Sequence, residues 1–400
     1  MISRRKLLLA SNAAGLGALL PAGLARAAET AVLPFENGER PLVTYPGKRP
    51  LLRLTARPPQ LETPLSVYDG DDLTQNDAFF VRYHLAGSPP QIDQEAWRLS
   101  IGGAVDRRLG YSLAQLKSAF KPIEYTAVLQ CSGNGRGFST PRVAGGQAGN
   151  GLMGNARWTG VPLRALLEQA GVKPSATHVS FNGADRPPHP GIPDFVKTLQ
   201  LNHAADGEVM LAYAMNGEDL PPLNGYPLRL IVPGWYGTYW IKHLTDIVVL
   251  DRPADAFWMD KAYRVPATDC ACVPAGEPAA ATVPISRMNV RSFVSSHADG
   301  ASARRGKIRL AGFAFDGGSG IRSVDVSTEG GGNWRRARLG PDKGRYAFRG
   351  WSAVVELPPG EHSIRVRAEN NLGAGQPMTA VWNPSGYMRN VVETLRLRVV

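Results

Sequence analysis

The spacing of hydrophobic and polar positions changes once along this chain, near residue 284. Before that point, short apolar runs typical of buried strands alternate with segments whose apolar residues recur at helical spacing. The predicted strands are 124–128, 178–181, 228–232 and 247–250, and the predicted helices are 112–120 and 162–170. Strands and helices mixed in this way predict an α+β domain, which we place at residues 61–275.

After residue 284, apolar and polar residues alternate as they do in half-buried strands. The clearest runs are 307–315, 323–327 and 362–368, and turns rich in Gly, Asp and Asn separate them. This pattern predicts an immunoglobulin-like β-sandwich over residues 284–400. Residues 270–282 are rich in Ala, Pro and Gly and are predicted to link the domains. Residues 28–60, rich in Pro and Arg with little periodicity, are predicted to form an extended N-terminal arm.

The first 27 residues have the features of an export signal. Arg4 and Arg5 begin a stretch of apolar and small residues, and Ala25-Arg26-Ala27 is typical of a cleavage site. We therefore expect residues 1–27 to be a twin-arginine signal peptide and the protein to be periplasmic. The stretch is too short and too interrupted for a lasting membrane helix, and no other segment is predicted to span a bilayer.

Composition and charge narrow the class of partner. A chain of 400 residues with 43% hydrophobic and 20% charged residues is typical of a globular protein. Cleavage of residues 1–27 would lower the formal net charge from +11 to +7. A basic protein can bind nucleic acid, an anionic substrate or an acidic protein. Export and the dispersed arginines argue against nucleic acid and leave the other two.

The chain has three cysteines, which cannot all pair. Cys270 and Cys272 are separated by one residue, so we expect them to be too close for an ordinary disulfide, and structural or free. No histidine follows them, so attachment of a c-type haem is not expected. The glycine-rich stretch 145–151 does not follow a predicted strand and open a helix, as a dinucleotide-binding turn must.

Cys131 ends the first predicted strand and is followed by a turn of small residues and by Arg136. Glycine in such a turn lets the backbone bend tightly around a group bound to the sulfur. A thiolate is favoured near positive charge and is a soft ligand for a transition metal. Taken alone, Cys131 is either an inert buried cysteine or a metal ligand.

Longer motifs decide between these interpretations. Gln-Cys-x-Gly-Asn-x-Arg at 130–136 resembles the molybdenum-ligand motif of the sulfite oxidase family. The segments 79–84, 210–217 and 225–242 are similar to further motifs of that family, and the order and spacing fit from about residue 62 to 400. Within the family, the variant around Cys131 and the segment 386–392 resemble bacterial periplasmic sulfite dehydrogenases that pass electrons to a cytochrome c.

The resemblance implies that one pterin dithiolene and Cys131 hold a molybdenum ion in the α+β domain, and that the C-terminal sandwich serves dimerisation. The catalytic residues implied are Arg82, His84, Arg136 and Tyr263. The cofactor-binding residues implied are Phe80, Arg82, His84, Asp185, Asn224, Arg229, Thr238 and Lys242. Two positions depart from vertebrate relatives: Asn224 replaces a histidine, and Ser385 replaces an arginine that reaches the substrate region.

The expected function is therefore oxidation of sulfite to sulfate at a molybdenum-molybdopterin centre. The chain shows no haem site of its own, so electrons are expected to pass one at a time to a c-type cytochrome, in either a homodimer or a heterodimer with that cytochrome. The alternatives are a methionine sulfoxide reductase or a sulfane-sulfur dehydrogenase subunit on the same scaffold, and an exported scaffold that has lost the metal.

Overall fold

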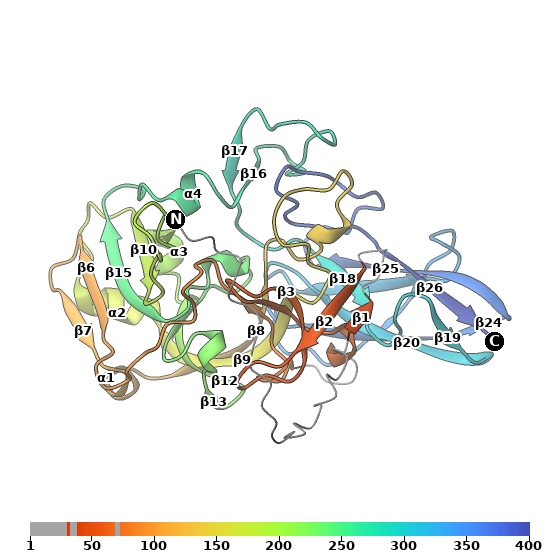
Figure 1. Cartoon of the computed structure of the whole chain (residues 1–400), viewed down its shortest axis with the longest axis horizontal. Helices are drawn as coiled ribbons and strands as arrows, with labels where there is room; N and C mark the ends of the chain where they lie inside the picture. The colour runs from red at the N-terminus through yellow and green to blue at the C-terminus, as the bar shows by residue number, and fades with distance from the viewer. Residues whose placement is uncertain (1–29, 33–37, 69–72) are drawn as a thin grey trace, which may run out of the picture.

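The computed structural model describes residues 30–32, 38–68 and 73–400, so the predicted signal peptide lies outside the described residues. An α+β part and a C-terminal β-sandwich lie side by side along the long axis (Figure 1). Within the described residues, no helix is long and apolar enough to cross a membrane.

One sheet of the α+β part carries the strand that leads to Cys131. Its strands are β13 (Glu218–Asp219), β12 (Met210–Met215), β9 (Met153–Pro162) and β8 (Ile123–Gln130), in that order, and β14 (Arg229–Ile231) also pairs with β12. The last four residues of β8 are buried, as the apolar run predicts. Because β8 pairs with β9 along its whole length, Cys131 begins its turn from a fixed point opposite Leu152.

A second sheet packs beside it and brings further cavity residues. Its order is β11 (Lys197–Gln200), β10 (His178–Gly183), β15 (Leu244–Leu250), β6 (Leu99–Gly103) and β7 (Leu109–Tyr111), with β15 and β6 parallel. The helices α1 (Leu113–Ala119), α2 (Leu163–Ala170) and α3 (Leu201–Ala204) belong to this part. Ser112 caps α1 with a capping box, and Gly171 ends α2 with a φ of 70°. The helices predicted over 112–120 and 162–170 are thus confirmed.

The segment predicted to be an extended arm is instead part of a sheet. Its described residues form β1 (Thr30–Val32), β2 (Glu39–Val43), β3 (Leu51–Thr55) and β4 (Gln60–Glu62), which continue into β5 (Val81–Arg82). The short strands escaped prediction because prolines and arginines interrupt them, while the buried side chains of Leu51 and Leu61 hold them against the rest of the protein. This sheet carries Arg82 at its inner end.

The C-terminal β-sandwich has the two antiparallel-rich layers that the alternating pattern predicts. One layer is β18 (Arg291–Val294), β20 (Gly306–Phe315), β24 (Arg349–Leu357) and β23 (Arg338–Leu339). The other is β19 (Ala301–Ala303), β26 (Thr394–Val399), β25 (Gly360–Asn370), β21 (Ile321–Ser327) and β22 (Arg335–Arg336). Phe293, Phe313 and Phe348 belong to the same buried cluster as Trp158 and Leu129 of the α+β part, so the hydrophobic core crosses the domain boundary.

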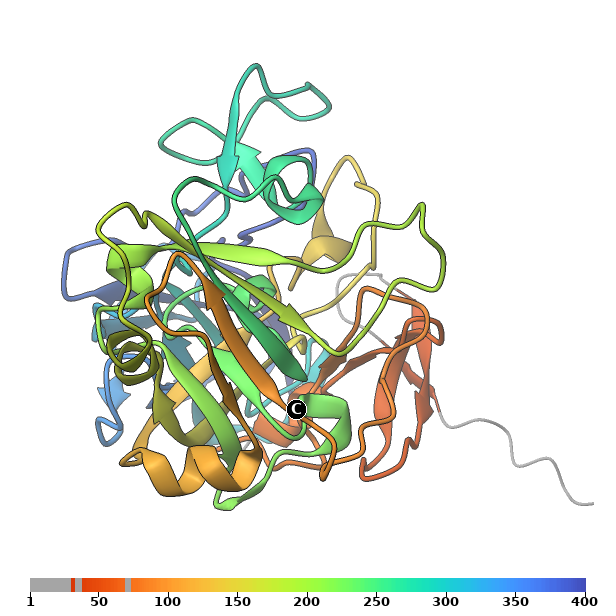
Figure 2. The ribbon, with the colours of Figure 1, turned by 90° about the vertical axis from the view of Figure 1, so that its left-hand side faces the viewer.

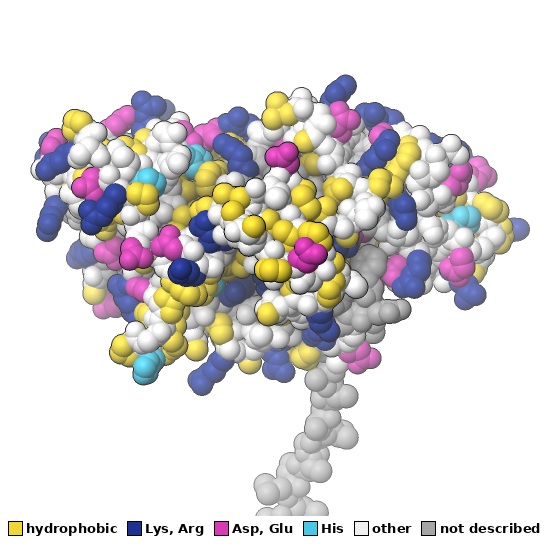
Figure 3. Space-filling view, turned by 90° about the horizontal axis from the view of Figure 1, so that it is seen from above, with side chains coloured by type: hydrophobic (Ala, Val, Ile, Leu, Met, Phe, Trp, Pro, Cys, Tyr) yellow, Lys and Arg dark blue, Asp and Glu magenta, His cyan; other side chains and the backbone are white. Residues whose placement is uncertain are grey.

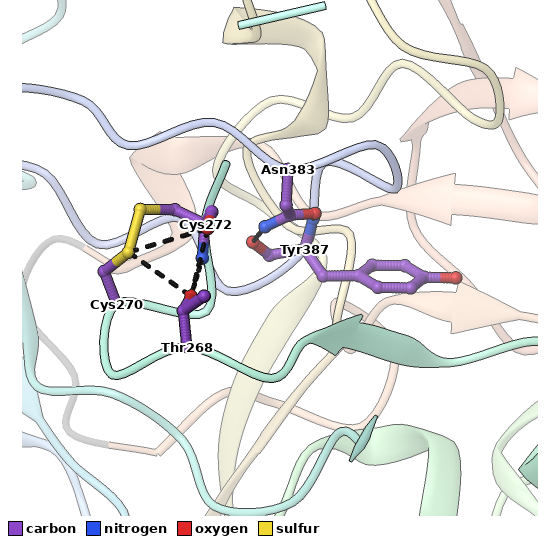
Figure 4. Close-up of a disulfide and its surroundings, with 5 residues drawn as sticks. All are labelled: Thr268, Cys270, Cys272, Asn383 and Tyr387. Atoms are coloured by element: carbon purple, nitrogen blue, oxygen red, sulfur yellow. Dashed lines mark hydrogen bonds between the residues drawn. A yellow bond between two sulfur atoms is a disulfide. The ribbon is translucent and has the colours of Figure 1, made fainter. Parts of the chain in front are cut away.

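The predicted linker is a closed hairpin. The strands β16 (Arg264–Pro266) and β17 (Thr282–Pro284) pair and project from the top of the molecule after α4 (Phe257–Asp260) (Figures 1 and 2). Within its loop, Cys270 and Cys272 form a disulfide, with Cα atoms 5.1 Å apart (Figure 4). The expectation that they are too close to pair was wrong. Ala271 takes a φ of 50°, which bends the chain enough to bring the two sulfurs together.

Candidate active site

A cavity lies where the three sheets of the α+β part converge. Every site residue predicted from the sequence lines it except Arg136: these are Phe80, Arg82, His84, Cys131, Asp185, Asn224, Arg229, Thr238, Lys242 and Tyr263. Residues from five separate stretches of sequence therefore meet at one place. The roles of the individual residues remain predictions.

Cys131 is the free cysteine of the described residues and is half-buried at the cavity wall. Its backbone N–H donates to Leu152 O at 2.9 Å. The side chain of Asn134 holds the turn from the other side, accepting from Leu152 N at 3.0 Å and donating to Asn150 O at 3.2 Å. Gly135, between Asn134 and Arg136, has a φ of 86°, a conformation that favours glycine. The thiol is thus presented by a rigid turn.

His84 and Tyr263 form a hydrogen-bonded pair at the cavity, between the ring Nε2 and the phenol hydroxyl. The imidazole also stacks on Phe195, with ring centroids 3.7 Å apart. Burial, followed by the positive charges of Arg82, Lys242 and Lys197, holds the pKa of His84 well below its ordinary value. Burial raises the pKa of Tyr263 above its ordinary value. Both groups are therefore neutral near pH 7.

Arg136 does not line the cavity and lies one layer behind it. Its Nε donates to Ser385 O at 2.9 Å, and its guanidinium lies over the ring of Tyr387 at 4.9 Å. Tyr387 in turn stacks on Tyr263, with centroids 5.3 Å apart and rings nearly parallel at 7°. A Cβ on Gly133 would lie 2.8 Å from the guanidinium carbon, so the glycine makes room for the arginine. Arg136 thus reaches the site through the two tyrosines.

The part of the cavity lined by Arg229 and Lys242 is positively charged. Arg229 is buried and Lys242 half-buried there beside Asp185, and Lys242 Nζ donates to Arg82 O at 2.8 Å. Burial lowers the pKa of Arg229 to about 9 and that of Lys242 to about 7. Burial also raises the pKa of Asp185, although Lys242 opposes that change. Cations outnumber carboxylates, so this end of the cavity is suited to an anion.

Three polar atoms at the cavity wall fit a large polar ligand. Arg229 Nε, Thr238 Oγ1 and Ser132 Oγ are buried, and none has a hydrogen-bond partner. Buried polar groups in native proteins are almost always paired, so such atoms need a partner that the protein itself does not supply. A phosphate and the heterocycle of a pterin offer acceptors and donors of this kind, and Cys131 offers a soft ligand for a metal. The residues present therefore fit a metal-bearing pterin.

Several groups around the site were not predicted from the sequence. Lys197, on β11, is fully buried; its Nζ donates to Trp258 O at 2.6 Å and lies 5.2 Å from the ring centroid of Tyr263. Phe195 and Tyr387 were also missed as site residues. The local signal that could have indicated Lys197 is its position among the apolar residues of 195–201. Lysine is rarely buried unless its ammonium is paired.

The two parts of the chain match known families. Residues 86–258 match the oxidoreductase molybdopterin-binding domain, and residues 282–399 match the Mo-co oxidoreductase dimerisation domain. Fold and site together define a molybdopterin oxidoreductase whose β-sandwich suggests oligomerisation.

Sequence comparison with individual proteins identifies the family. The chain is 33% identical to mitochondrial sulfite oxidase of Drosophila melanogaster over 89% of this chain and 64% of that protein. It is 33% identical to sulfite oxidase of Gallus gallus over 88% of this chain and 79% of that protein. The protein belongs to the sulfite oxidase family. The sulfane dehydrogenase SoxCD of Paracoccus pantotrophus shares its fold, with a TM-score of 0.72, 24% identity, and coverage of 96% of this chain and 93% of that one.

Proposed function

We propose that this protein oxidises sulfite to sulfate in the periplasm. Sulfite gains one oxygen atom that derives from water, two protons are released, and two electrons pass singly to a c-type cytochrome. The observation that carries the proposal is the grouping of Arg82, His84 and Tyr263 in the cavity that Cys131 also lines. A fixed cation and a neutral donor pair beside a soft metal ligand suit a small sulfur oxyanion.

Each cavity residue has a task in this proposal. Arg82 binds an oxygen of sulfite and offsets its negative charge. The hydroxyl of Tyr263 positions the anion by a hydrogen bond, and the His84–Tyr263 pair holds and moves a proton during turnover. Phe195 packs flat against the imidazole and keeps water from its face. Arg136 favours the anion from one layer further back, through Tyr387.

The cofactor in this proposal is a molybdenum ion carried by one molybdopterin, which supplies oxygen transfer and two-electron chemistry when bound. Cys131 would hold the metal. Arg229 and Lys242 would bind the pterin phosphate, and Asp185 would accept from the amino groups of the pterin. Phe80, Asn224 and Thr238 line the same end and would complete the cofactor site.

The outer surface supports a protein acceptor. Figure 3 shows the upper face, where apolar side chains gather in the middle and basic side chains are spread around them. Phe257 of α4 and Val283 of β17, two elements at the top of Figure 1, are 46% and 45% exposed. An apolar centre within a charged rim is typical of a transient interface, and the basic excess would attract an acidic face of the cytochrome.

Sulfite-dependent reduction of ferricyanide and of cytochrome c tests the proposal. The chain is purified with its molybdenum quantified, and Arg82→Met is compared with Arg142→Met, which removes an exposed arginine elsewhere. We expect Arg82→Met to lower kcat/KM for sulfite by about 10²-fold or more, because a buried charged contact to the anion is lost. Arg142→Met should turn over like the wild type.

Other outcomes point elsewhere. Molybdenum without sulfite turnover would contradict the proposal, and reduction of methionine sulfoxide by the same sample would favour the reductase alternative. Turnover of a sulfane-sulfur substrate but not of sulfite would favour the sulfane dehydrogenase alternative. A competently matured chain without metal would indicate a scaffold. Detection of the mature chain in the periplasmic fraction, dependent on Arg4 and Arg5, tests the location.

A further inference from the structure

We propose that Lys48 is a positioning residue for the molybdopterin phosphate, acting through Asn224. Lys48 lies between β2 and β3, outside the part of the chain that matches the molybdopterin-binding family. The inference rests on the cofactor of the proposed function and is independent of its substrate.

Lys48 is buried in a way that is unusual for a lysine. Its residue is 5% exposed, and its Nζ donates to three acceptors: Asn76 O at 2.5 Å, Phe79 O at 2.9 Å and Asn224 Oδ1 at 2.5 Å. These contacts use all three hydrogens of the ammonium. The nearby carboxylate of Asp77 is paired with Arg49 at 2.7 Å, and no ion pair of the described residues includes Lys48. A buried ammonium without a carboxylate is destabilising unless another charge compensates it.

The contact with Asn224 fixes the orientation of an amide at the cavity wall. Because Oδ1 of Asn224 accepts from Lys48, its NH₂ group must face the other way, where it donates to Phe80 O at 3.0 Å and keeps its second hydrogen. The backbone carbonyl of Asn224 accepts from Nη1 of Arg229 at 2.7 Å. One lysine therefore positions both the amide and the carbonyl that holds the cavity arginine.

The positive charge near Lys48 and Asn224 indicates which part of the cofactor these residues help to position. Arg229 lies close enough to oppose the charged forms of both Lys48 and Lys242, and Asp185 is the one carboxylate that lines the cavity. Burial lowers the pKa of Lys48 to about 7, so a bound anion would readily restore its proton. A phosphate monoester carries a charge of about −1.5 to −2 near pH 7, which matches this excess.

Cofactor retention tests the inference without using activity. Full-length Lys48→Met is made in a host that synthesises molybdopterin, and pterin per chain is measured by fluorescence after oxidation. The matched control is Lys197→Met, which removes the other buried lysine whose pKa burial lowers to about 7. We expect pterin content to fall about fivefold or more in Lys48→Met, since a charge-assisted contact is lost, and to stay near the wild-type level in the control.

Inorganic phosphate provides a second readout on chains freed of cofactor. Phosphate should raise the unfolding temperature of the wild type and of Lys197→Met, and raise that of Lys48→Met much less. If Lys48→Met does not fold, Lys48→Gln removes the charge but keeps a donor, and Lys48→Arg keeps the charge. We expect loss of pterin in Lys48→Gln and retention of pterin in Lys48→Arg.

The results separate this inference from the proposed function. Wild-type pterin content in a folded Lys48→Met or Lys48→Gln chain, with unchanged stabilisation by phosphate, would overturn the role of Lys48. A competently matured wild-type chain that holds no pterin would instead contradict the proposed function.

Discussion

At the scale of single residues, the cavity keeps its proton-carrying groups neutral. His84 is surrounded by Arg82, Lys197 and Lys242, and burial acts in the same direction as their charges. Tyr263 is kept protonated by burial. A neutral imidazole keeps a lone pair that can accept a hydrogen bond from the phenol, which an imidazolium cannot do. The surrounding cations thus keep the imidazole neutral, and their excess of positive charge also suits an anion.

The lowered pKa of His84 predicts how activity depends on pH. A histidine whose pKa lies well below its ordinary value stays neutral across the range from about pH 6 to 8, where an ordinary histidine with a pKa of about 6.5 would titrate. We therefore expect the pH profile of kcat to contain no ionisation of His84 near pH 6.5. The profile of His84→Asn should accordingly keep every limb that the wild type shows in this range. A limb of the pH profile that does disappear in this variant would contradict the assignment.

Removing the phenol hydroxyl predicts a selective loss of rate. Tyr263→Phe keeps the ring stacked on Tyr387 but removes the hydrogen bond to His84. We expect kcat to fall by about 10²-fold, the usual contribution of a positioned proton-transfer group, with molybdenum and pterin contents unchanged. Tyr239→Phe is a suitable control, because it removes another buried phenol that is bonded to a backbone carbonyl. Equal losses in both variants would indicate a packing effect alone.

Lys197 predicts a dependence of stability on pH. Burial lowers its pKa from 10.5 to about 7 in the folded protein, so between these values the unfolded chain binds more protons. Stability should therefore rise with pH from about 7 to 10. Urea unfolding at pH 7 and pH 9 should show this rise reduced in Lys197→Met by about 1 kcal/mol or more. Parallel pH dependences of wild type and variant would show that the buried ammonium is not destabilising.

At the scale of elements, the β16–β17 hairpin connects its disulfide to the active site. Val273 N donates to Trp382 O at 3.0 Å, and the segment that follows carries Tyr387 to the stack on Tyr263. The backbone N–H of Cys272 also donates to the Thr268 hydroxyl at 3.1 Å (Figure 4). Disorder in this loop would therefore loosen one wall of the site.

The disulfide predicts the number of free thiols in the protein. Thiol titration of the denatured, unreduced mature protein should give one thiol per chain, from Cys131, and three after reduction. The variant Cys270→Ala/Cys272→Ala should lower the free energy of unfolding by only about 1–2 kcal/mol, because the closed loop is very short. Three thiols before reduction would show that the pair is free in solution.

Sequence patterns predicted the elements whose signals are local. The capped helix after Ser112, the buried run that ends at Cys131 and the alternating strands of the sandwich all follow from neighbouring residues. Strands β2–β4 and the contact from Lys48 to Asn224 depend on residues far apart in the sequence, and no periodicity records them. The residues that the motifs single out line one cavity except Arg136, whose guanidinium lies over Tyr387, because a motif gives spacing and not depth.

At the scale of the whole molecule, the α+β part and the β-sandwich form one structural unit. Arg291 of β18 is 2% exposed and donates to Gln130 Oε1 at 3.3 Å, directly before Cys131. It also pairs with Glu393 at 3.4 Å. Hydrogen bonds from Arg291 to Gln130 and Asn150, together with a continuous apolar core, therefore hold the sandwich against the turn that presents the thiol.

This arrangement predicts a single cooperative unfolding transition in calorimetry. Arg291→Met should lower the free energy of unfolding by about 3 kcal/mol, near the lower end for a broken buried pair, because Glu393 keeps its contact with Arg389. Arg322→Met, which breaks an exposed pair with Glu369, should change it by less than about 1 kcal/mol. Two separate transitions in the wild type would contradict the shared core.

The contacts from the sandwich to the Cys131 turn also bear on when the site is completed during protein synthesis. The motif residues from Arg82 to Tyr263 leave the ribosome first, whereas Arg291, Tyr387 and Glu393 come from the later part of the chain. A nascent chain that has emerged only as far as the hairpin therefore holds its thiol in an unfinished, open pocket. We therefore expect insertion of the cofactor to follow translation of the sandwich, with Cys131 lacking part of its surroundings until then.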